Sequence, residues 1–237
     1  MNTEAQKQLQ KTYSSWVFDC DGVILDSNKA KANAFYAAAL RYGEHTAEAI
    51  RTYHMNNGGI SRFTKFRYVF EMLLGRTEYE DDYQLMIRDF SQCSKEELKL
   101  CKPVSGVREF LQSAPKGTKR FVVSGAEEEE LKWCLEFHGL AQYFDGIYGS
   151  PKAKPEILAS LIKSNLAPAP AIYFGDSKYD FESATASGYD FVFVSEATDY
   201  ADWRNFVKKN CIFSISNFCE LNANSATPVQ DRWANCF

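Results

Sequence analysis

The stretch Trp16-Val17-Phe18-Asp19-Cys20-Asp21-Gly22 decides how this chain folds, because a short apolar run ends there in two carboxylates. A second stretch, Ile172 to Ser177, has the same form: an apolar run followed by Gly-Asp-Ser, with Asp180 shortly after it. Apolar runs without alternation are typical of strands buried on both faces of a parallel sheet. We therefore expect four acids near the carboxyl ends of two buried strands: Asp19, Asp21, Asp176 and Asp180.

Two further apolar runs, Phe121–Val123 and Phe191–Val194, have the composition of buried strands, and the first is followed by Ser124-Gly125. Helical patterns lie between the runs, as in Glu127–Phe137, whose leading acids we interpret as a solvated first turn at the positive end of a helix dipole. Alternating strands and helices predict an α/β fold with a doubly wound parallel sheet, which is Rossmann-like.

The segment 27-102 interrupts this alternation with a series of helical patterns and few strand-like runs. The expected helices are Ala30–Tyr42, Phe63–Leu74, Asp81–Phe90 and Lys95–Cys101, with Gly58-Gly59 separating two of the elements. We therefore predict a helical domain, 27-102, inserted into a core formed by 13-26 and 103-221. A polar tail, 222-237, follows the core.

The bulk composition narrows the class of partner. The chain has 237 residues and a net charge of −4, which gives no reason to expect nucleic acid or an anionic membrane as partner. No apolar run approaches the ~20 residues of a membrane helix, and the N-terminus lacks an apolar signal core. We expect a cytoplasmic protein that acts on a small molecule; the sequence leaves the oligomeric state open.

The cysteines indicate neither a disulfide framework nor a zinc site, because there are seven of them and no Cys-x-x-Cys pair. Cys20 lies between two acids, whose negative charge disfavours its thiolate. We therefore do not expect Cys20 to be a nucleophile.

The four acids predict a metal site. Open α/β sheets bind ligands beyond the carboxyl ends of their strands. Several carboxylates crowded there are costly unless a cation neutralises them, and Mg²⁺ prefers oxygen ligands. We therefore expect Mg²⁺ as cofactor. Asp19 and Asp21, two residues apart, can divide the roles of nucleophile and proton carrier.

Ser124-Gly125 offers a hydroxyl and free backbone N–H groups at the start of a helix, a natural seat for phosphate oxygens. A lysine is then expected to balance the charge. Two candidates follow at Lys152 and Lys154, in the segment Gly149–Pro155.

In this order and placement, the motifs resemble those of the haloacid dehalogenase-like hydrolases, a phosphatase-rich superfamily with an aspartyl nucleophile. The resemblance covers nearly the whole chain. It rests on Phe18–Val23, on Val122–Gly125, on the lysine segment and on Gly175–Asp180. The helical insertion resembles the α-helical cap of the first type found in that family.

The resemblance implies a role for each residue. Asp19 would attack phosphorus, and Asp21 would protonate the leaving oxygen and then activate water. An acid at the position of Asp21 is what separates the family's phosphatases from its dehalogenases. The residues implied to hold Mg²⁺ are Asp19, Asp21 through its backbone carbonyl, Asp176 and, as a ligand or an anchor, Asp180.

Ser124, the Gly125 N–H and a lysine would hold the phosphoryl oxygens. In related proteins the lysine often precedes a Pro-x-Pro-Asp segment. Aligning Pro155-Glu156 with that Pro-Asp favours Lys152 over Lys154 as the phosphate-binding lysine.

The insertion is expected to determine specificity. Gly59-Ile60-Ser61-Arg62 resembles the cap loop of β-phosphoglucomutases, in which the arginine contacts substrate phosphate. Arg62 and Lys65 can share one helix face and would bind a second anionic group of the substrate. The alternative is a surface helix with ordinary basic residues. We expect His54, near the two glycines, to be structural or exposed.

The leading hypothesis is a Mg²⁺-dependent phosphatase that hydrolyses a small phosphorylated metabolite, a sugar phosphate or a phosphoglycolate-like acid, through an aspartyl-phosphate. One alternative is a sugar phosphomutase of the β-phosphoglucomutase type. Those enzymes carry a histidine in the cap linker, and this chain has Lys31 at the corresponding position, which counts against that alternative. The other is a non-catalytic domain that binds a phosphorylated ligand or a partner; intact Asp19 and Asp21 count against it.

Overall fold

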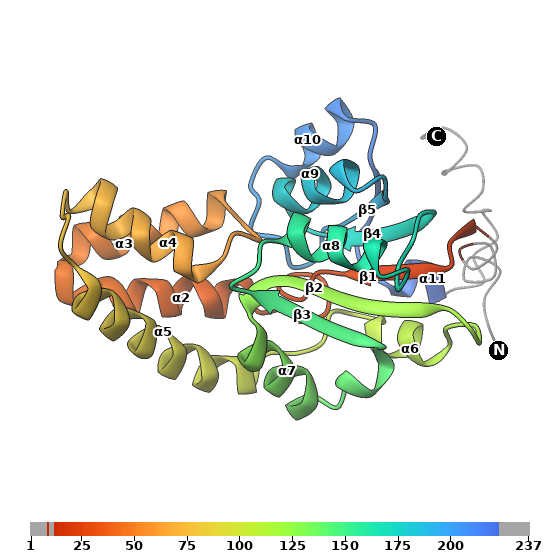
Figure 1. Cartoon of the computed structure of the whole chain (residues 1–237), viewed down its shortest axis with the longest axis horizontal. Coiled ribbons are helices and arrows are strands. Elements are labelled where there is room, and N and C mark those ends of the chain that lie inside the picture. Colours follow the sequence, from red (N-terminus) through yellow and green to blue (C-terminus); the bar gives the residue numbers. More distant parts are fainter. Residues whose placement is uncertain (1–8, 10–11, 223–237) are drawn as a thin grey trace.

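The computed structural model describes residue 9 and residues 12–222, in which six parallel strands form one sheet in the order β3-β2-β1-β4-β5-β6 (Figure 1). The chain adds β2 and β3 on one side of β1 and then returns to add β4, β5 and β6 on the other. The topological switch therefore lies at β1, and the predicted doubly wound α/β fold is confirmed. The strands are β1 (Ser15–Phe18), β2 (Lys119–Glu127), β3 (Gly146–Ser150), β4 (Ala171–Gly175), β5 (Asp190–Val194) and β6 (Phe213–Ile215).

The central strand β1 is buried along its whole length and is hydrogen-bonded on both sides. Val17 is paired with Phe121 of β2 and with Tyr173 of β4. Because these three strands are parallel and in register, the residues that follow each of them come to the same edge of the sheet.

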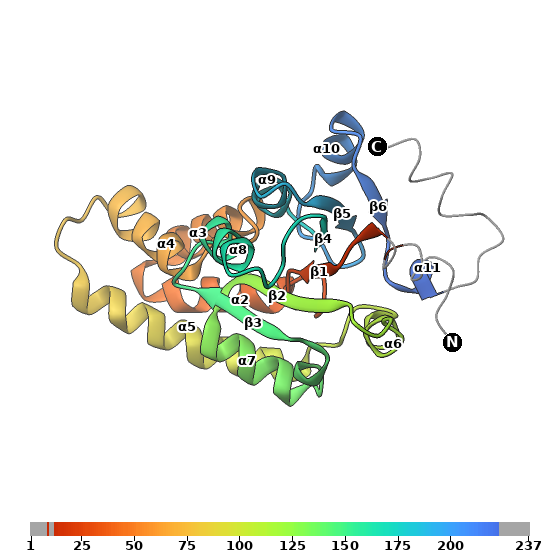
Figure 2. The same cartoon turned by 45° about the vertical axis from the view of Figure 1, so that its right-hand side comes forward.

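Helices cover both faces of the sheet, as Figures 1 and 2 show. On one face, α6 (Val107–Gln112), α7 (Glu128–Phe137) and α11 (Cys219–Asn222) pack on an apolar cluster that includes Trp16 and Phe18. On the other face, α8 (Lys154–Lys163), α9 (Lys178–Ala186) and α10 (Trp203–Lys209) pack on a cluster around Val17 and Tyr173. Alternate residues of β1 thus enter opposite cores, as expected for a strand buried on both faces.

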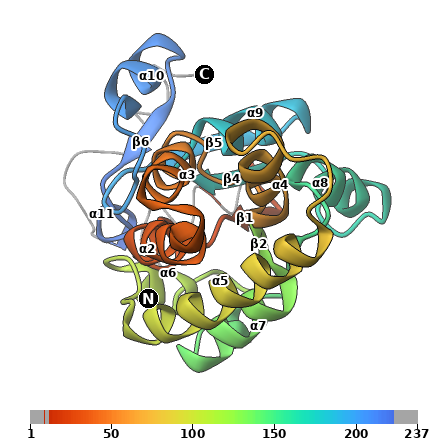
Figure 3. The ribbon, with the colours of Figure 1, turned by 90° about the vertical axis from the view of Figure 1, so that its left-hand side faces the viewer.

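The insertion between β1 and α6 is helical and has an apolar core of its own, built around Phe35, Phe66, Phe70 and Phe90. Its helices lie beyond the edge of the sheet at which β1, β2 and β4 end (Figure 3). They are α2 (Asn28–Ala39), α3 (Glu44–Asn56), α4 (Arg62–Tyr68) and α5 (Glu80–Leu100).

The structure differs from the expected elements in several places. Instead of separate helices over Asp81–Phe90 and Lys95–Cys101, α5 is one continuous helix. The sequence patterns did not predict α3, β3 or β6. The tail 222-237 lies outside the described residues except for Asn222, which ends α11. No helix in the described part of the chain combines the length and apolarity needed to cross a membrane.

Candidate functional site

Three buried carboxylates meet where β1 and β4 end. Asp19 follows β1, Asp176 follows β4, and Asp180 lies in the first turn of α9; each offers one oxygen within 4.8 Å of the others. The parallel register of the two strands brings Asp19 and Asp176 together from positions far apart in the sequence.

Charge crowding in this cluster calls for a cation. Burial, followed by repulsion from Asp180 and Asp21, raises the pKa of Asp19 to about 7 against the opposing charge of Lys154. Burial, then Asp180 and Asp19, raise the pKa of Asp176 well above its usual range. Among the described residues, the one polar partner of Asp19 Oδ1 is the ammonium of Lys154 at 2.9 Å. An oxygen-lined, anionic and buried site of this kind fits Mg²⁺.

Asp180 is the carboxylate most fully satisfied by the protein itself. Its Oδ2 accepts hydrogen bonds from the hydroxyl of Ser177 at 2.6 Å and from the Ser177 backbone N–H at 3.2 Å. Its Oδ1 accepts from the hydroxyl of Tyr173 at 3.2 Å and from Lys154 at 2.5 Å. Asp19 and Asp176 therefore have more free coordinating capacity than Asp180, which is suited to anchoring the cluster.

The lysine beside the acids is Lys154, not Lys152, which corrects the preference drawn from the sequence. Lys154 opens α8, is fully buried, and places its ammonium 2.9 Å from Asp19 Oδ1 and 2.5 Å from Asp180. Burial opposes its charge, but Asp180 and Asp19 outweigh burial and raise the pKa of Lys154. Lys152 lies in the preceding loop and is exposed to solvent.

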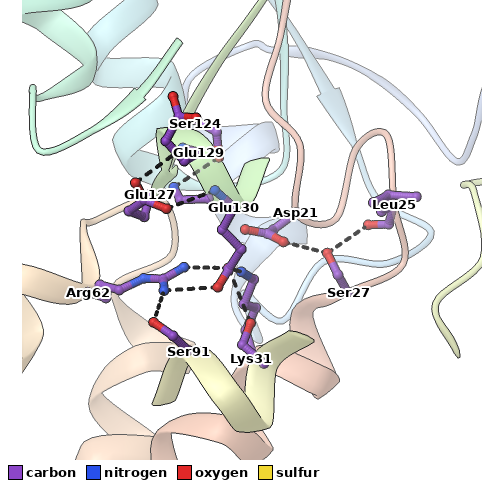
Figure 4. Close-up of polar contacts among 12 residues, drawn as sticks. Asp21, Leu25, Ser27, Lys31, Arg62, Ser91, Ser124, Glu127, Glu129 and Glu130 are labelled. Atoms are coloured by element: carbon purple, nitrogen blue, oxygen red, sulfur yellow. Dashed lines mark hydrogen bonds and ion pairs between the residues drawn. The ribbon is translucent and has the colours of Figure 1, made fainter. Parts of the chain in front are cut away.

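Asp21 lies outside the three-acid cluster. Its carboxylate is half-buried and accepts a hydrogen bond of 2.5 Å from the hydroxyl of Ser27 at the start of the insertion (Figure 4). Asp21 lines the same small cavity as Asp19, Ser124 and Gly125. The cavity measures about 40 Å³, and the predicted nucleophile, proton carrier and phosphate seat all border it.

Two glycines allow the insertion to approach the sheet. A Cβ atom on Gly125 would overlap the backbone carbonyl of Gly59, so the loop between α3 and α4 rests directly on the end of β2. Gly59 has a φ of +79°, and a Cβ there would lie 3.2 Å from the ammonium of Lys154. The insertion therefore closes one side of the cavity.

The predicted basic residues of the insertion, Arg62 and Lys65, both line the small cavity. They are 4% and 1% exposed, which rules out the alternative of an ordinary surface helix. Arg62 is bonded to Glu130 of α7 and to Ser91 of α5, whereas Lys65 lies 2.8 Å from Nδ1 of His54. Burial is the largest effect on Lys65 and lowers its pKa to about 7.

Sequence reasoning missed three residues of the site. Asn28 Nδ2 donates to Asp176 Oδ2 at 2.8 Å, and Lys31 Nζ donates to Glu130 at 2.6 Å. Nothing in the local pattern distinguishes Asn28. Glu130 was expected in a solvated turn, but it is 4% exposed; its place next to Leu131, on the buried side of α7, was the available signal. Burial raises the pKa of the Cys20 thiol well above its usual value, which disfavours the thiolate.

A second cavity of about 140 Å³ adjoins the first. It shares Asn28, His54 and Asp176 with the first cavity and is bordered on its other side by α9. His54, expected to be structural or exposed, is buried between the two cavities, and burial followed by the charge of Lys65 lowers its pKa.

Comparisons with known proteins agree with this geometry. The family model of the haloacid dehalogenase-like hydrolases matches residues 16–194. The chain is 28% identical, over 75% of its length and 82% of the other protein, to a phosphatase of phosphorylated carbohydrates from Thermotoga maritima.

Solved structures share the fold at lower identity. A predicted phosphatase from Clostridium acetobutylicum superposes with a TM-score of 0.70 at 19% identity, covering 89% of this chain and 97% of the other. A predicted phosphoglycolate phosphatase from Haemophilus somnus superposes with a TM-score of 0.63 at 19% identity, covering 77% and 85%. The match over residues 16–194 spans both strand-end acids, so the chain belongs to the haloacid dehalogenase-like hydrolases.

Proposed function

We propose that this protein is a Mg²⁺-dependent phosphatase that hydrolyses a small phosphorylated metabolite through an aspartyl-phosphate. The observation that carries the proposal is the buried carboxylate of Asp19, which borders a small cavity with the ammonium of Lys154 at 2.9 Å and Asp176 beside it. A buried carboxylate that lies beside an ammonium and borders a cavity is suited to act as a nucleophile toward phosphorus.

The phosphoryl group would lie in the small cavity beside Asp19. Ser124 and the backbone N–H of Gly125 border that cavity and would donate to its oxygens, and Lys154 would offset the charge that develops in the transition state. Asp19, Asp176 and the backbone carbonyl of Asp21 would hold Mg²⁺. When bound, the ion supplies positive charge that neutralises the crowded oxygens and polarises the phosphoryl group.

Asp21 would carry the proton in both halves of the reaction. It would first protonate the leaving oxygen and then take a proton from the water that attacks the aspartyl-phosphate. The hydrogen bond from Ser27 holds the Asp21 carboxylate at the rim of the cavity, which supports this role. Lys31 is ion-paired with Glu130, so it does not offer the proton shuttle that a phosphomutase would need.

The substrate class is a phosphomonoester of a small metabolite. The relative from Thermotoga maritima is named for phosphorylated carbohydrates, and structural neighbours are named for phosphoglycolate. Cavities of about 40 and 140 Å³ beside the acids suit small leaving groups.

The test is release of inorganic phosphate from a panel of sugar phosphates, phosphorylated acids and p-nitrophenyl phosphate. We expect release with Mg²⁺, none with EDTA, and a loss of at least about a thousandfold in Asp19→Asn. Asp81→Asn, the same change at an exposed position in α5, is the matched control and should retain wild-type rates. Absence of release from every ester would refute the proposal.

A further inference from the structure

A buried carboxylate of the core, Glu130 in α7, is surrounded by basic and hydroxyl side chains of the insertion (Figure 4). Its oxygens accept hydrogen bonds from Lys31 at 2.6 Å, from Ser94 at 3.2 Å and from both terminal nitrogens of Arg62, one of them at 3.0 Å. Lys31, Arg62 and Glu130 are each at most 5% exposed. The contacts therefore form a closed ion cluster between core and insertion.

Glu130 and Lys31 each keep their charge in this buried cluster. Burial alone would raise the pKa of Glu130, but Lys31 and Arg62 outweigh burial and lower it to about 2. For Lys31, the charge of Glu130 likewise outweighs burial and raises the pKa. Glu130 thus neutralises part of the positive charge that the insertion brings to the cavity.

The position of the cluster links it to substrate choice. Lys31 and Arg62 line the cavity of about 40 Å³ together with Asp19 and Asp21, and Glu130 lies behind them. A lysine ammonium has three N–H donors, and within the described part of the chain Glu130 is the only acceptor that Lys31 reaches. Donors remain to bind a hydroxyl oxygen of a leaving group.

The charge around the cavity does not favour a second anion. Asp21 carries the proton for the leaving oxygen, so with Lys65 protonated the carboxylates and the cations are equal in number: Asp19, Asp176, Asp180 and Glu130 against Lys31, Arg62, Lys65 and Lys154. A bound Mg²⁺ and a phosphate dianion cancel in net charge. A carboxylate or second phosphate on the leaving group would therefore add an unbalanced negative charge to a buried site.

We propose that Glu130 makes the site selective for phosphomonoesters whose leaving group is an uncharged, hydroxyl-bearing alcohol, as in a carbohydrate phosphate, over phosphorylated acids and bisphosphates. This inference rests on the proposed function and narrows its substrate class. Glu130 acts through Lys31 and Arg62 and is a specificity-determining residue that need not touch the substrate.

The test uses two esters that differ only in this charge: 2-hydroxyethyl phosphate and 2-phosphoglycolate, in which a carboxylate replaces the hydroxymethyl group. With Mg²⁺, we expect the wild-type kcat/KM to favour 2-hydroxyethyl phosphate by at least about tenfold. Glu130→Gln keeps the shape and removes the charge, so the ratio should move toward 2-phosphoglycolate by about tenfold. Glu129→Gln changes an exposed neighbour paired with Lys132 and should leave the ratio unchanged.

A wild-type preference for 2-phosphoglycolate, or an unchanged ratio in folded Glu130→Gln, would overturn the inference. If Glu130→Gln does not fold, the ratio of the two kcat/KM values in wild type decides: a preference for 2-hydroxyethyl phosphate supports the inference, and a preference for 2-phosphoglycolate overturns it. If neither ester releases phosphate, the broader ester panel decides on the proposed function, and the ratio of the two dissociation constants by titration calorimetry tests the selectivity independently of turnover.

Discussion

Two lysines separated by one residue differ in burial and in contacts because one opens a helix and the other lies in a loop. Lys154 is the first residue of α8 and is buried against Asp19 and Asp180, whereas Lys152 is exposed. Both are equally basic in the sequence, and the Pro155-Glu156 alignment favoured Lys152, the lysine that lies away from the acids. The choice depends on where α8 begins, which a sequence pattern fixes only to within a few residues.

Replacing each lysine separately tests this assignment. In Lys154→Met we expect phosphate release to fall by at least about a hundredfold, because a donor to the transition state is lost and two buried acids lose their partner. Lys152→Met removes only a solvated charge and should stay within about twofold of wild type. Equal losses in the two variants would contradict the assignment.

Lys65 predicts an unusual pH dependence of stability. Its pKa is lowered from 10.5 to about 7 by burial, so between these values the unfolded chain binds more protons than the folded protein. The free energy of unfolding contributed by Lys65 therefore rises with pH across this window. Urea denaturation should show wild type gaining stability between about pH 7 and about pH 9 relative to Lys65→Met. Parallel profiles for the two proteins would count against a buried Lys65 with a lowered pKa.

At the scale of elements, the strands that carry the chemistry could be predicted and the edge strands could not. The run Ser15–Phe18 coincides with β1 because all its side chains are apolar or small and buried on both faces. At one edge of the sheet, β3 is only half-buried over Gly146–Tyr148, and at the other β6 has three residues. Neither offers an apolar run that stands out from a loop.

The insertion shows the same limit for helices. Separate helices were expected over Asp81–Phe90 and Lys95–Cys101, but α5 continues through Ser91 and Ser94, whose side chains bond to Arg62 and Glu130. A polar residue buried by a partner from a distant segment has no local signature. For the same reason the sequence did not place Glu130 and Asn28 at the site: their hydrogen-bond partners lie far away in the sequence.

The loop between α3 and α4 contacts the site through Gly59, and substitution of this glycine tests the contact. Gly59 and Gly75 both have positive φ, so alanine at either position costs about 1 kcal/mol of backbone strain. Only at Gly59 would the added Cβ crowd Lys154 and Tyr179, each at 3.2 Å; at Gly75 it meets open space. We expect kcat/KM to fall at least about tenfold in Gly59→Ala and to be retained in Gly75→Ala. A matching loss of activity in Gly75→Ala would show that strain, not contact with the site, is responsible.

In the molecule as a whole, apolar packing, rather than contacts among the acids, holds the elements that carry the site in place. Two apolar clusters hold the sheet between its helices, and a third holds the insertion together. These cores place Asp19, Asp176 and Asp180 within 4.8 Å of one another although mutual repulsion opposes it. Without metal, repulsion among these carboxylates therefore destabilises the folded protein, and a bound divalent cation would relieve that repulsion.

This cost predicts how the whole protein responds to metal. The proposed Mg²⁺ site is formed only in the folded state, so Mg²⁺ at about 100 times its Kd should stabilise wild type by about 3 kcal/mol and raise Tm by several degrees. Asp176→Asn removes one of the repelling charges, so its Tm in EDTA should exceed that of wild type, and Mg²⁺ should no longer raise it. Differential scanning calorimetry with and without Mg²⁺ measures both effects. A full Mg²⁺ shift in Asp176→Asn would show that Asp176 is not a ligand.

The central claim is that Asp19 receives the phosphoryl group, and trapping it is the most direct measurement. Wild-type protein turning over a phosphate ester with Mg²⁺ is quenched in acid, digested and analysed by peptide mass spectrometry. We expect one added phosphoryl group on the peptide that contains Asp19, and none in Asp19→Asn treated in the same way. Phosphate release by wild type with no phosphoryl group on that peptide, or with one on another residue, would show that Asp19 is not the nucleophile.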